Sequence, residues 1–260
     1  MLRLFARRPQ KLVRSELALV LDDGRELTVA LCRHPRARRI KLSVDERGPR
    51  LTLPARASER SAIAFLHEHR QWLVGQLDAI GPAHAPLRPW HTASLPVLGD
   101  ELPVAWVVAR ATRLLDDAGA LRFEVRGDGV DAHGHASPAV RRALRDYLEA
   151  KGRAEIARLL LGYLPGLPRA PARIGFKSTS SQWGSLSPAG TVTLDTALLL
   201  APRAAFDYVL VHELCHLLHA DHSPAFWGEV QARCPQWRQQ RKWLQTNGRG
   251  LKARWLALTS

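Results

Sequence analysis

Three histidines and one glutamate in the last quarter of the sequence have the spacing of a catalytic metal site. His212 and His216 lie four positions apart, so on a helix both imidazoles point to one side and can bind the same metal ion. Glu213 lies near enough to take a proton from a water molecule on that metal. His222 follows six positions after His216, where a turn could return it as a third ligand. Three protein ligands and one open position are typical of a catalytic zinc, one Zn²⁺ per chain.

The residues around this motif favour a metal site over a chance match. A chance His-Glu-x-x-His is expected in roughly one or two such chains per hundred, with the histidines then making ordinary hydrogen bonds on a solvated helix face. Here apolar residues recur at helical spacing on the side opposite the two histidines. They are Phe206, Leu210, Leu214, Leu217 and Leu218. A helix with this pattern buries one side in a core and turns its histidines toward a cleft.

The composition is that of a globular protein with a strong positive charge. The chain has 260 residues, enough for one large domain or two small ones, and a net charge of +14. Such a charge attracts anionic partners such as nucleotides or nucleic acid, although an arginine-rich composition also raises the charge of proteins that have no anion site. The three cysteines have no close-spaced pairs, so no disulfide framework is expected. Cys215 points away from the histidines and is expected to pack in the core.

The sequence gives no sign of a membrane partner. No apolar run approaches the eighteen or so residues that a membrane-spanning helix needs. The first residues, Met1 to Arg8, lack the apolar core and the cleavage site of a secretory signal. We therefore expect a cytoplasmic protein, and the sequence does not indicate its oligomeric state.

Residues 1–135 have the pattern of a β-rich N-terminal region. Alternating apolar and polar residues predict a hairpin between residues 39 and 53. Ser58 can cap a helix over about 58–80. Further short strands are expected at 95–98, 104–109 and 121–125. This region precedes a catalytic half of residues 136–260, and it could either form a separate domain or wrap around that half.

The catalytic half begins with a long helical segment. Ser137 can cap a helix whose first turn holds Pro138. The apolar pattern continues to about Tyr163, so we expect one helix, or a helical pair if Gly152 breaks it. After the histidine helix, Ser223 and the proline behind it can begin a short helix that fixes where His222 points. A final basic helix is expected over residues 236–244.

Two strands and a loop precede the histidine helix. The strands are expected over residues 173–177 and 191–194, with a polar loop over 178–187 between them. Pro202 then opens the helix at its first turn. Strands that lead into a metal-binding helix commonly form the ceiling of a cleft, and an edge strand there can pair with an extended peptide.

Several segments of the chain resemble the YgjP-like family of zinc metallopeptidases. In the catalytic half they are Gln182-Trp-Gly-Ser185, Tyr208-Val-Leu-Val-His212-Glu-Leu-Cys-His216 and His222-Ser-Pro-Ala-Phe-Trp227. In the N-terminal half they are Arg38-Arg-Ile-Lys-Leu, Phe65-Leu with Trp72-Leu, and Leu98-Gly99. The resemblance covers most of the chain and is far more specific than the histidine motif alone.

This resemblance, with the elements above, implies an α+β fold with a zincin-like catalytic core. Antiparallel strands would pack on the metal-binding helix, and the β-rich region would precede the core. The family resemblance implies zinc held by His212, His216 and His222, with Glu213 as the general base.

Two details of the sequence limit what carries over. The histidine spacing equals that of metzincins, but these have a glycine where His219 stands, which argues against that class. The YgjP-like family typically has an arginine where Gln182 stands and a cysteine where Leu186 stands. At this position Gln182 is the candidate to contact the transition state or a ligand, in place of an arginine that would bind an anionic group or stabilise an oxyanion.

Four other residues could assist the reaction or orient a ligand. His219 and Tyr208 lie about one turn after His216 and before His212, near the metal face. Either could donate a hydrogen bond to the oxyanion, or merely face solvent. Asp195 and Asp207 could each accept a hydrogen bond from the free ring nitrogen of a histidine ligand, and the sequence does not choose between them.

These patterns lead to three functional hypotheses. The first is hydrolysis of peptide or protein substrates by water activated by zinc and Glu213. The second keeps the zinc site but cleaves a nucleotide phosphoanhydride, whose phosphates the positive charge would attract. The third is a basic, nucleic-acid-associated module in which protease activity acts on bound proteins or is absent; no RNA-binding motif or recognition helix supports it. The sequence does not identify the substrate or the bond.

Overall fold

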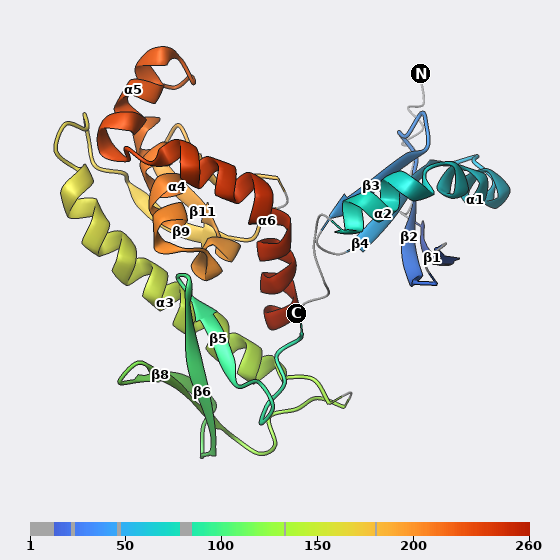
Figure 1. Ribbon diagram of the computed structural model, residues 1–260, viewed down its shortest axis with the longest axis horizontal. Helices are drawn as coiled ribbons and strands as arrows, with labels where there is room; N and C mark the ends of the chain where they lie inside the picture. The colour runs from blue at the N-terminus through green and yellow to red at the C-terminus, as the bar shows by residue number, and fades with distance from the viewer. Residues whose placement is uncertain (1–12, 22–23, 46–47, 79–84, 133, 180) are drawn as a thin grey trace, which may run out of the picture. The chain divides into compact units, whose positions relative to one another are not determined.

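The computed structural model describes residues 13–21, 24–45, 48–78, 85–132, 134–179 and 181–260 (Figure 1). The predicted α+β class is confirmed, and contacts divide the chain into two compact units, Met1–Pro82 and Ala83–Ser260. The boundary expected at residue 135 lies within the second unit and stays a prediction. In the described ranges no helix is long and apolar enough to cross a membrane. Residues 1–8, considered for a secretory signal, lie outside these ranges.

The first unit contains a four-stranded sheet. Its strands are β1 (Val13–Val20), β2 (Glu26–His34), β3 (Lys41–Asp45) and β4 (Gly48–Pro54), in the order β1-β2-β4-β3. The hairpin predicted between residues 39 and 53 is the antiparallel pair β3 and β4. The buried leucines of β2 and β4 form one core with Leu66 and Leu73 of the helices that follow.

These helices are α1 (Glu59–Glu68) and α2 (Arg70–Asp78). As predicted, Ser58 caps α1, because its hydroxyl accepts a hydrogen bond of 3.1 Å from the backbone N–H of Ser61. The single helix expected over 58–80 is interrupted at His69, whose φ of −103° and ψ of 14° are not helical. The ring of His69 stacks on Phe65 and its Nδ1 lies 3.0 Å from the Phe65 carbonyl oxygen, a contact that helical spacing alone does not reveal.

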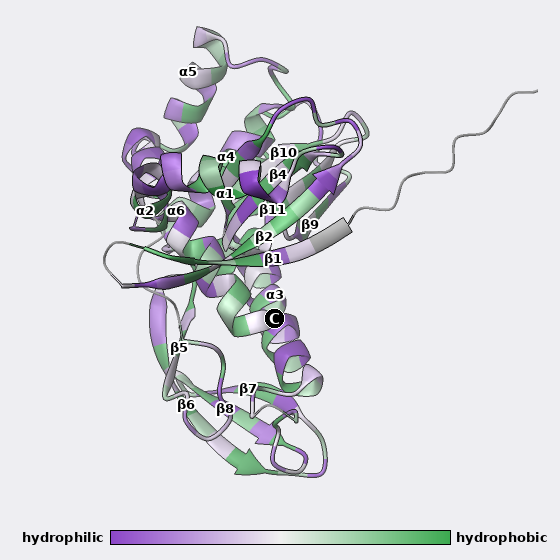
Figure 2. Cartoon of the chain, turned by 90° about the vertical axis from the view of Figure 1, so that its right-hand side faces the viewer, coloured by the Kyte–Doolittle hydropathy of each residue, from purple (hydrophilic) through white to green (hydrophobic). Residues whose placement is uncertain are grey.

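The second unit contains a sheet with the same topology. Its strands are β5 (Ser94–Val97), β6 (Asp100–Val108), β7 (Arg113–Asp117) and β8 (Ala120–Val125), in the order β5-β6-β8-β7. In both sheets the outer pairs are antiparallel and the central pair is parallel. Figure 2 shows hydrophobic and hydrophilic residues mixed along β6 and β8, as expected for strands with one buried face. Of the four strands, β7 was not predicted.

One continuous helix, α3 (Pro138–Tyr163), follows this sheet, and Ser137 caps it as predicted. Gly152 lies inside the helix and does not break it. A Cβ at this glycine would lie 2.6 Å from the ring of Phe176 and would also collide with Leu199. Gly152 therefore allows α3 to pack closely on the elements that lead into the histidine helix.

A second, three-stranded sheet supports the histidine helix. Its strands are β9 (Arg173–Lys177), β10 (Gly184–Leu186) and β11 (Thr191–Asp195), in the order β10-β11-β9. The strands β10 and β11 are antiparallel, whereas the two predicted strands, β9 and β11, run parallel to each other. The strand β10 lies in a segment that was expected to be a loop; its three residues are too few for a visible alternation. A 3₁₀ helix (Thr196–Leu200) connects β11 to the helices.

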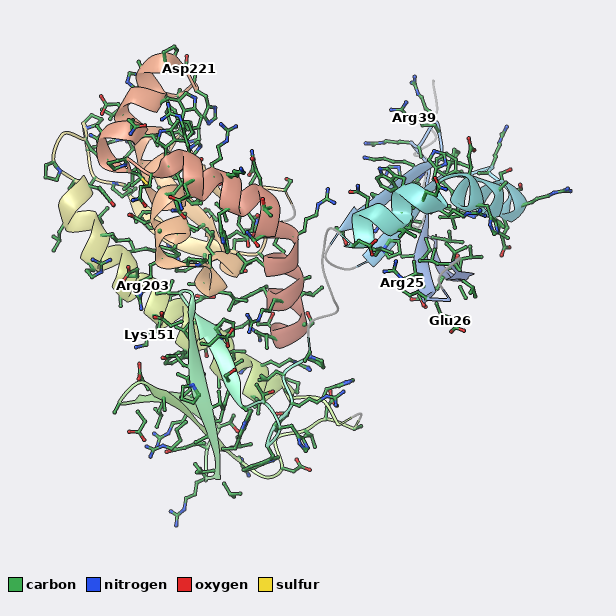
Figure 3. The ribbon with its side chains drawn as sticks, viewed as in Figure 1. Arg25, Glu26, Arg39, Lys151, Arg203 and Asp221 are labelled. Atoms are coloured by element: carbon green, nitrogen blue, oxygen red, sulfur yellow. The ribbon has the colours of Figure 1, made fainter. Side chains whose placement is uncertain are left out.

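The histidine helix, α4 (Arg203–Cys215), lies between the long helices α3 and α6 (Figure 1). It is followed by α5 (Pro224–Arg233) and α6 (Trp237–Thr259), which is much longer than the final helix expected over residues 236–244. Phe206, Leu210 and Leu214 are fully buried, as the apolar stripe predicted. Leu217 and Leu218 of the same predicted stripe follow the end of α4 and are only partly buried, and Leu217 lines the cavity of the histidines. Arg203, labelled in Figure 3, begins α4 and forms ion pairs with Glu155 of α3 and Asp100 of β6.

Candidate metal centre

The structure brings the three predicted histidine ligands together. Their ring nitrogens lie within 4.8 Å of one another, and Nε2 of His212 is 3.1 Å from Nε2 of His222. Two nitrogens that each lie about 2.05 Å from a tetrahedral zinc are roughly 3.3 Å apart. The separation between His212 and His222 therefore fits two ligands of one such cation. Within the described residues, these histidines are the only group of three metal-ligand side chains so arranged.

Backbone turns after α4 orient two of the histidines. Nδ1 of His216 lies 3.0 Å from the carbonyl oxygen of His219, so the ring can donate to it and keep the Nε2 lone pair free. His222 precedes the start of α5, where Ser223 caps the helix as predicted. Asp221, labelled in Figure 3, accepts a hydrogen bond of 3.2 Å from the backbone N–H of Ser223. These bonds fix the turn from which His222 reaches the other two rings.

The second ring nitrogen of His212, Nδ1, is buried without a hydrogen-bond partner among the described residues. Neither candidate carboxylate is bonded to it: Asp195 accepts hydrogen bonds from the N–H and the hydroxyl of Thr179, and Asp207 accepts one of 2.7 Å from the hydroxyl of Tyr163. The sequence proposed both carboxylates as hydrogen-bond acceptors for the free ring nitrogen of a histidine ligand. In the structure their oxygens accept hydrogen bonds from other residues.

Aromatic side chains of α5 cover the histidine cluster. The ring centroid of Phe226, which is fully buried, lies 5.0, 4.6 and 4.9 Å from those of His212, His216 and His222. Trp227 lies 5.7 Å from His212 and 5.8 Å from His222. This packing restricts the rings and excludes water from one side of the site. Burial lowers the pKa of His212 to about 3, so the ring stays neutral, the form that binds a metal.

Glu213 points into the same site and is almost fully buried, with 4% of its surface exposed. Burial raises the pKa of its carboxyl group to about 7. Gly184 of β10 lies directly against it: a Cβ on this glycine would come within 2.6 Å of Oε1 and of Cγ of Glu213. Only a glycine fits there without moving the carboxylate, which explains the glycine in the segment Gln182-Trp-Gly-Ser185.

A cavity of about 850 Å³ connects these residues. Its wall contains the three histidines, Glu213, the segment 182–188 and part of α6. Tyr208 and Gln182, two of the predicted candidates, line it; His219 does not, and contributes its backbone carbonyl to His216. Burial raises the pKa of Tyr208 to about 12, against the opposing effect of the Arg241 guanidinium.

Residues of α6 form a wall that the sequence analysis missed. Arg241, Leu244 and Gln245 line the cavity, although the sequence identified this stretch only as a basic helix. Their spacing of three and four positions places them on one face of the helix. No motif in the sequence indicates that this face turns toward histidines that lie 19 to 33 positions earlier.

The helix α6 also contacts the loop that leads into β10, the strand that lies against Glu213. Nζ of Lys252 donates to the carbonyl oxygens of Thr179 and Gln182, at 2.6 and 3.2 Å, and forms a 3.1 Å ion pair with the buried Asp195. It also lies 4.8 Å from the ring centre of Trp183. Lys252 therefore ties the end of β11 to the loop that leads into β10.

The chain matches the model of one known protein family. A model of the YgjP-like metallopeptidase domain matches residues 38–247, which include all three histidines and Glu213. The chain belongs to the YgjP-like metallopeptidase family. Membership places it among metal-dependent peptidases, which act on peptides or proteins.

Other comparisons are more distant. The crystal structure of the metallopeptidase zymogen of Pyrococcus abyssi abylysin is 24% identical over 40% of this chain and 97% of that chain. Its TM-score of 0.26 is too low to equate the two folds. A comparison of this chain with curated protein sequences gave no match.

Proposed function

We propose that this chain is a zinc-dependent peptidase in which His212, His216 and His222 hold the ion and Glu213 is the general base. The observation that carries the proposal is the cluster of imidazole nitrogens within 4.8 Å, in one cavity with a buried glutamate. Imidazole ligands suit zinc, and three of them leave a coordination position open. When bound, zinc would lower the pKa of a water molecule toward 7 and polarise the carbonyl group of the scissile peptide bond.

Glu213 supplies the proton transfers in this proposal. Its carboxylate accepts a proton from the attacking water and donates it to the amine that leaves. A pKa of about 7 in the chain without metal makes the carboxyl group a strong enough base, and a cation beside it would favour the ionised form at neutral pH. Gly184 keeps the carboxylate in one position.

Tyr208 is the residue we propose as hydrogen-bond donor to the substrate oxygen that gains negative charge. It lines the cavity, and its ring centroid lies 5.9 Å from that of His212. Its hydroxyl has no hydrogen-bond partner among the described residues, and its pKa of about 12 keeps it protonated at neutral pH. His219 is less suited because its side chain is not part of the cavity wall. Gln182 lines the cavity as well, and its amide is available to a bound peptide.

The substrate chain fits the free edge of the three-stranded sheet. β10 is the edge strand, and residues 184–188 line the cavity beside Glu213. An extended peptide can add to such an edge as a further strand, with main-chain hydrogen bonds that do not depend on its side chains. This arrangement supports a peptide rather than a nucleotide as the substrate.

Cleavage of casein by the zinc-loaded chain tests this proposal. We expect the wild-type chain to cleave casein and Glu213→Gln to lose cleavage while it keeps its zinc. A nucleotide panel run in parallel separates the competing reaction. Release of phosphate or pyrophosphate without peptide cleavage would overturn the proposal, and cleavage by Glu213→Gln would refute the role of the base.

A further inference from the structure

We propose that the cavity binds a carboxylate of its peptide substrate, and that Arg241 of α6 is the residue that recognises it. The inference rests on the peptidase function proposed above and names the class of substrate: peptides that carry a carboxylate close to the bond that is cut. The carboxylate can belong to an acidic side chain or to the C-terminus of a short peptide.

The charges in the cavity wall are the first observation. Arg241 and Arg169 line the cavity, and among the described residues of its wall Glu213, which is buried, is the only acidic side chain. In the described part of the chain, neither arginine forms an ion pair or hydrogen bond with an Asp or Glu side chain. Other arginines of the same unit, such as Arg158 and Arg233, are paired with glutamates. The cavity thus presents guanidinium groups that no carboxylate of the described residues neutralises.

The position of Arg241 is the second observation. Its Cζ lies 5.3 Å from the ring centre of Trp227, whose ring is 5.8 Å from that of His222 and stacks on Trp237 at 4.3 Å. Contact with the ring restrains the guanidinium beside the histidines, at low entropic cost to a ligand. The ring offers no hydrogen-bond acceptor atom to compete for the N–H donors, and a planar guanidinium can bind a carboxylate through two parallel hydrogen bonds.

Arg169 has a different position and a lesser role. A Cβ on Gly190 would lie 3.6 Å from Cζ of Arg169, which places the guanidinium at the turn between β10 and β11. Its charge raises the positive potential of the cavity mouth and so attracts anionic peptides. The net charge of +14 adds to this attraction but does not select a position on the peptide.

Arg238 provides a matched control within the same helix. It also lies over a tryptophan, with Cζ 4.5 Å from the ring centre of Trp237, and it donates a 2.7 Å hydrogen bond to Gln231. It does not line the cavity. Arg241→Gln and Arg238→Gln therefore remove the same charge from similar surroundings and differ in whether the substrate can reach it.

The test uses the full, zinc-loaded chain and quenched peptides based on one site cleaved in casein. Three peptides are compared: one with Glu near the scissile bond and blocked ends, the same peptide with Gln, and a peptide without acidic side chains but with a free C-terminal carboxylate close to the bond. We expect the wild type to prefer a carboxylate peptide over the Gln peptide by on the order of tenfold in kcat/KM. Arg241→Gln should remove this preference mainly through KM, and Arg238→Gln should keep it.

The outcomes separate the possible sources of the effect. Loss of preference for the Glu peptide identifies a side-chain carboxylate, and loss of preference for the free C-terminus identifies a terminal one; both support the proposal. An equal loss on all three peptides, or no wild-type preference, overturns it. If no peptide is cleaved, the peptidase function fails, and carboxylate recognition is then tested by binding. Zinc-loaded Glu213→Gln is titrated with the Glu, Gln and free C-terminus peptides, and tryptophan fluorescence reports binding. Tighter binding of at least one carboxylate peptide supports the proposal, and equal affinities refute it.

Discussion

Gly184 and Glu213 are in direct contact, although 29 positions separate them in the sequence. A Cβ on the glycine would lie 2.6 Å from Oε1, 2.6 Å from Cγ and 2.8 Å from Cδ of the glutamate. The flexible end of a side chain can move out of such a collision, but here that end is the proposed base. The position of the carboxylate in the cavity therefore depends on the absence of a side chain on β10.

Gly184→Ala should consequently lower peptidase activity without loss of the fold. A base displaced by about 1 Å can lose on the order of a hundredfold in rate. Gly175→Ala is the control, because it lies in β9 of the same sheet and a Cβ there meets nothing within 4 Å. Casein cleavage and zinc content are measured for both variants. Wild-type activity in Gly184→Ala would show that the contact does not position the base.

The metal-free chain should lose stability at Glu213 as pH rises. Burial raises the folded-state pKa from 4.5 to about 7, so the folded state binds more protons than the unfolded state between these values. Ionisation of the buried Glu213 lowers the free energy of unfolding. This loss is absent below pH 4.5, grows as pH rises and is complete above about pH 7, where it amounts to roughly 3 kcal/mol.

Glu213→Gln removes this titration. With chelator present, the stability of the variant relative to wild type should increase from pH 5 to pH 8, as measured by urea unfolding at several pH values. The buried amide of the variant changes its free energy of unfolding by an amount that does not depend on pH. The test is therefore how the difference between variant and wild type changes with pH, and not whether the difference is positive or negative. A difference that does not change with pH would contradict the raised pKa.

Tyr208→Phe should reduce kcat with little change in KM. Removal of one donor to a developing oxyanion typically costs a hundredfold or more in kcat. His219→Ala is the comparison, since its side chain does not line the cavity and its backbone carbonyl, which holds His216, is kept. Steady-state kinetics on one casein-derived peptide distinguish them. If His219→Ala loses as much kcat as Tyr208→Phe, the assignment of the donor is wrong.

Lys252→Met should destabilise the chain, because it leaves the Asp195 carboxylate buried with one partner fewer. Asp195 is 2% exposed and Lys252 is 11% exposed as side chains, and loss of one member of a buried pair typically costs about 3 kcal/mol or more. Lys242→Met, on the exposed face of the same helix, should change the free energy of unfolding little. Urea unfolding of the zinc-loaded variants measures both. Equal stability of the two would show that the Lys252 pair does not hold the loop.

The sequence predicted those parts of the site that depend on local spacing. His212 and His216 share a helix face, three of the five apolar residues expected opposite them are fully buried, and Ser223 caps the next helix; each follows from residues within a few positions of one another. The predicted caps at Ser58 and Ser137 are also confirmed, and they too depend only on residues a few positions apart. The α+β class followed from the predicted strands and helices together with the family resemblance.

The contacts that complete the site join residues far apart and could not be predicted in this way. Asp195 is near the histidine helix in sequence, yet its carboxylate pairs with Lys252, which lies 57 positions later. Arg241 reaches the cavity because of how α6 packs, which its own pattern of charges does not reveal. The shared topology of the two four-stranded sheets likewise has no counterpart as a repeat in the sequence.

The central claim is that the three histidines hold one zinc ion, and metal analysis of the purified chain tests it most directly. After exposure to zinc and removal of the excess, we expect about one zinc per chain in the wild type and in Glu213→Gln. His212→Ala should retain almost none, whereas His91→Ala, which changes an exposed histidine outside the cluster, should match the wild type. A wild-type chain without zinc, or a His212→Ala chain with as much zinc as the wild type, would contradict the account.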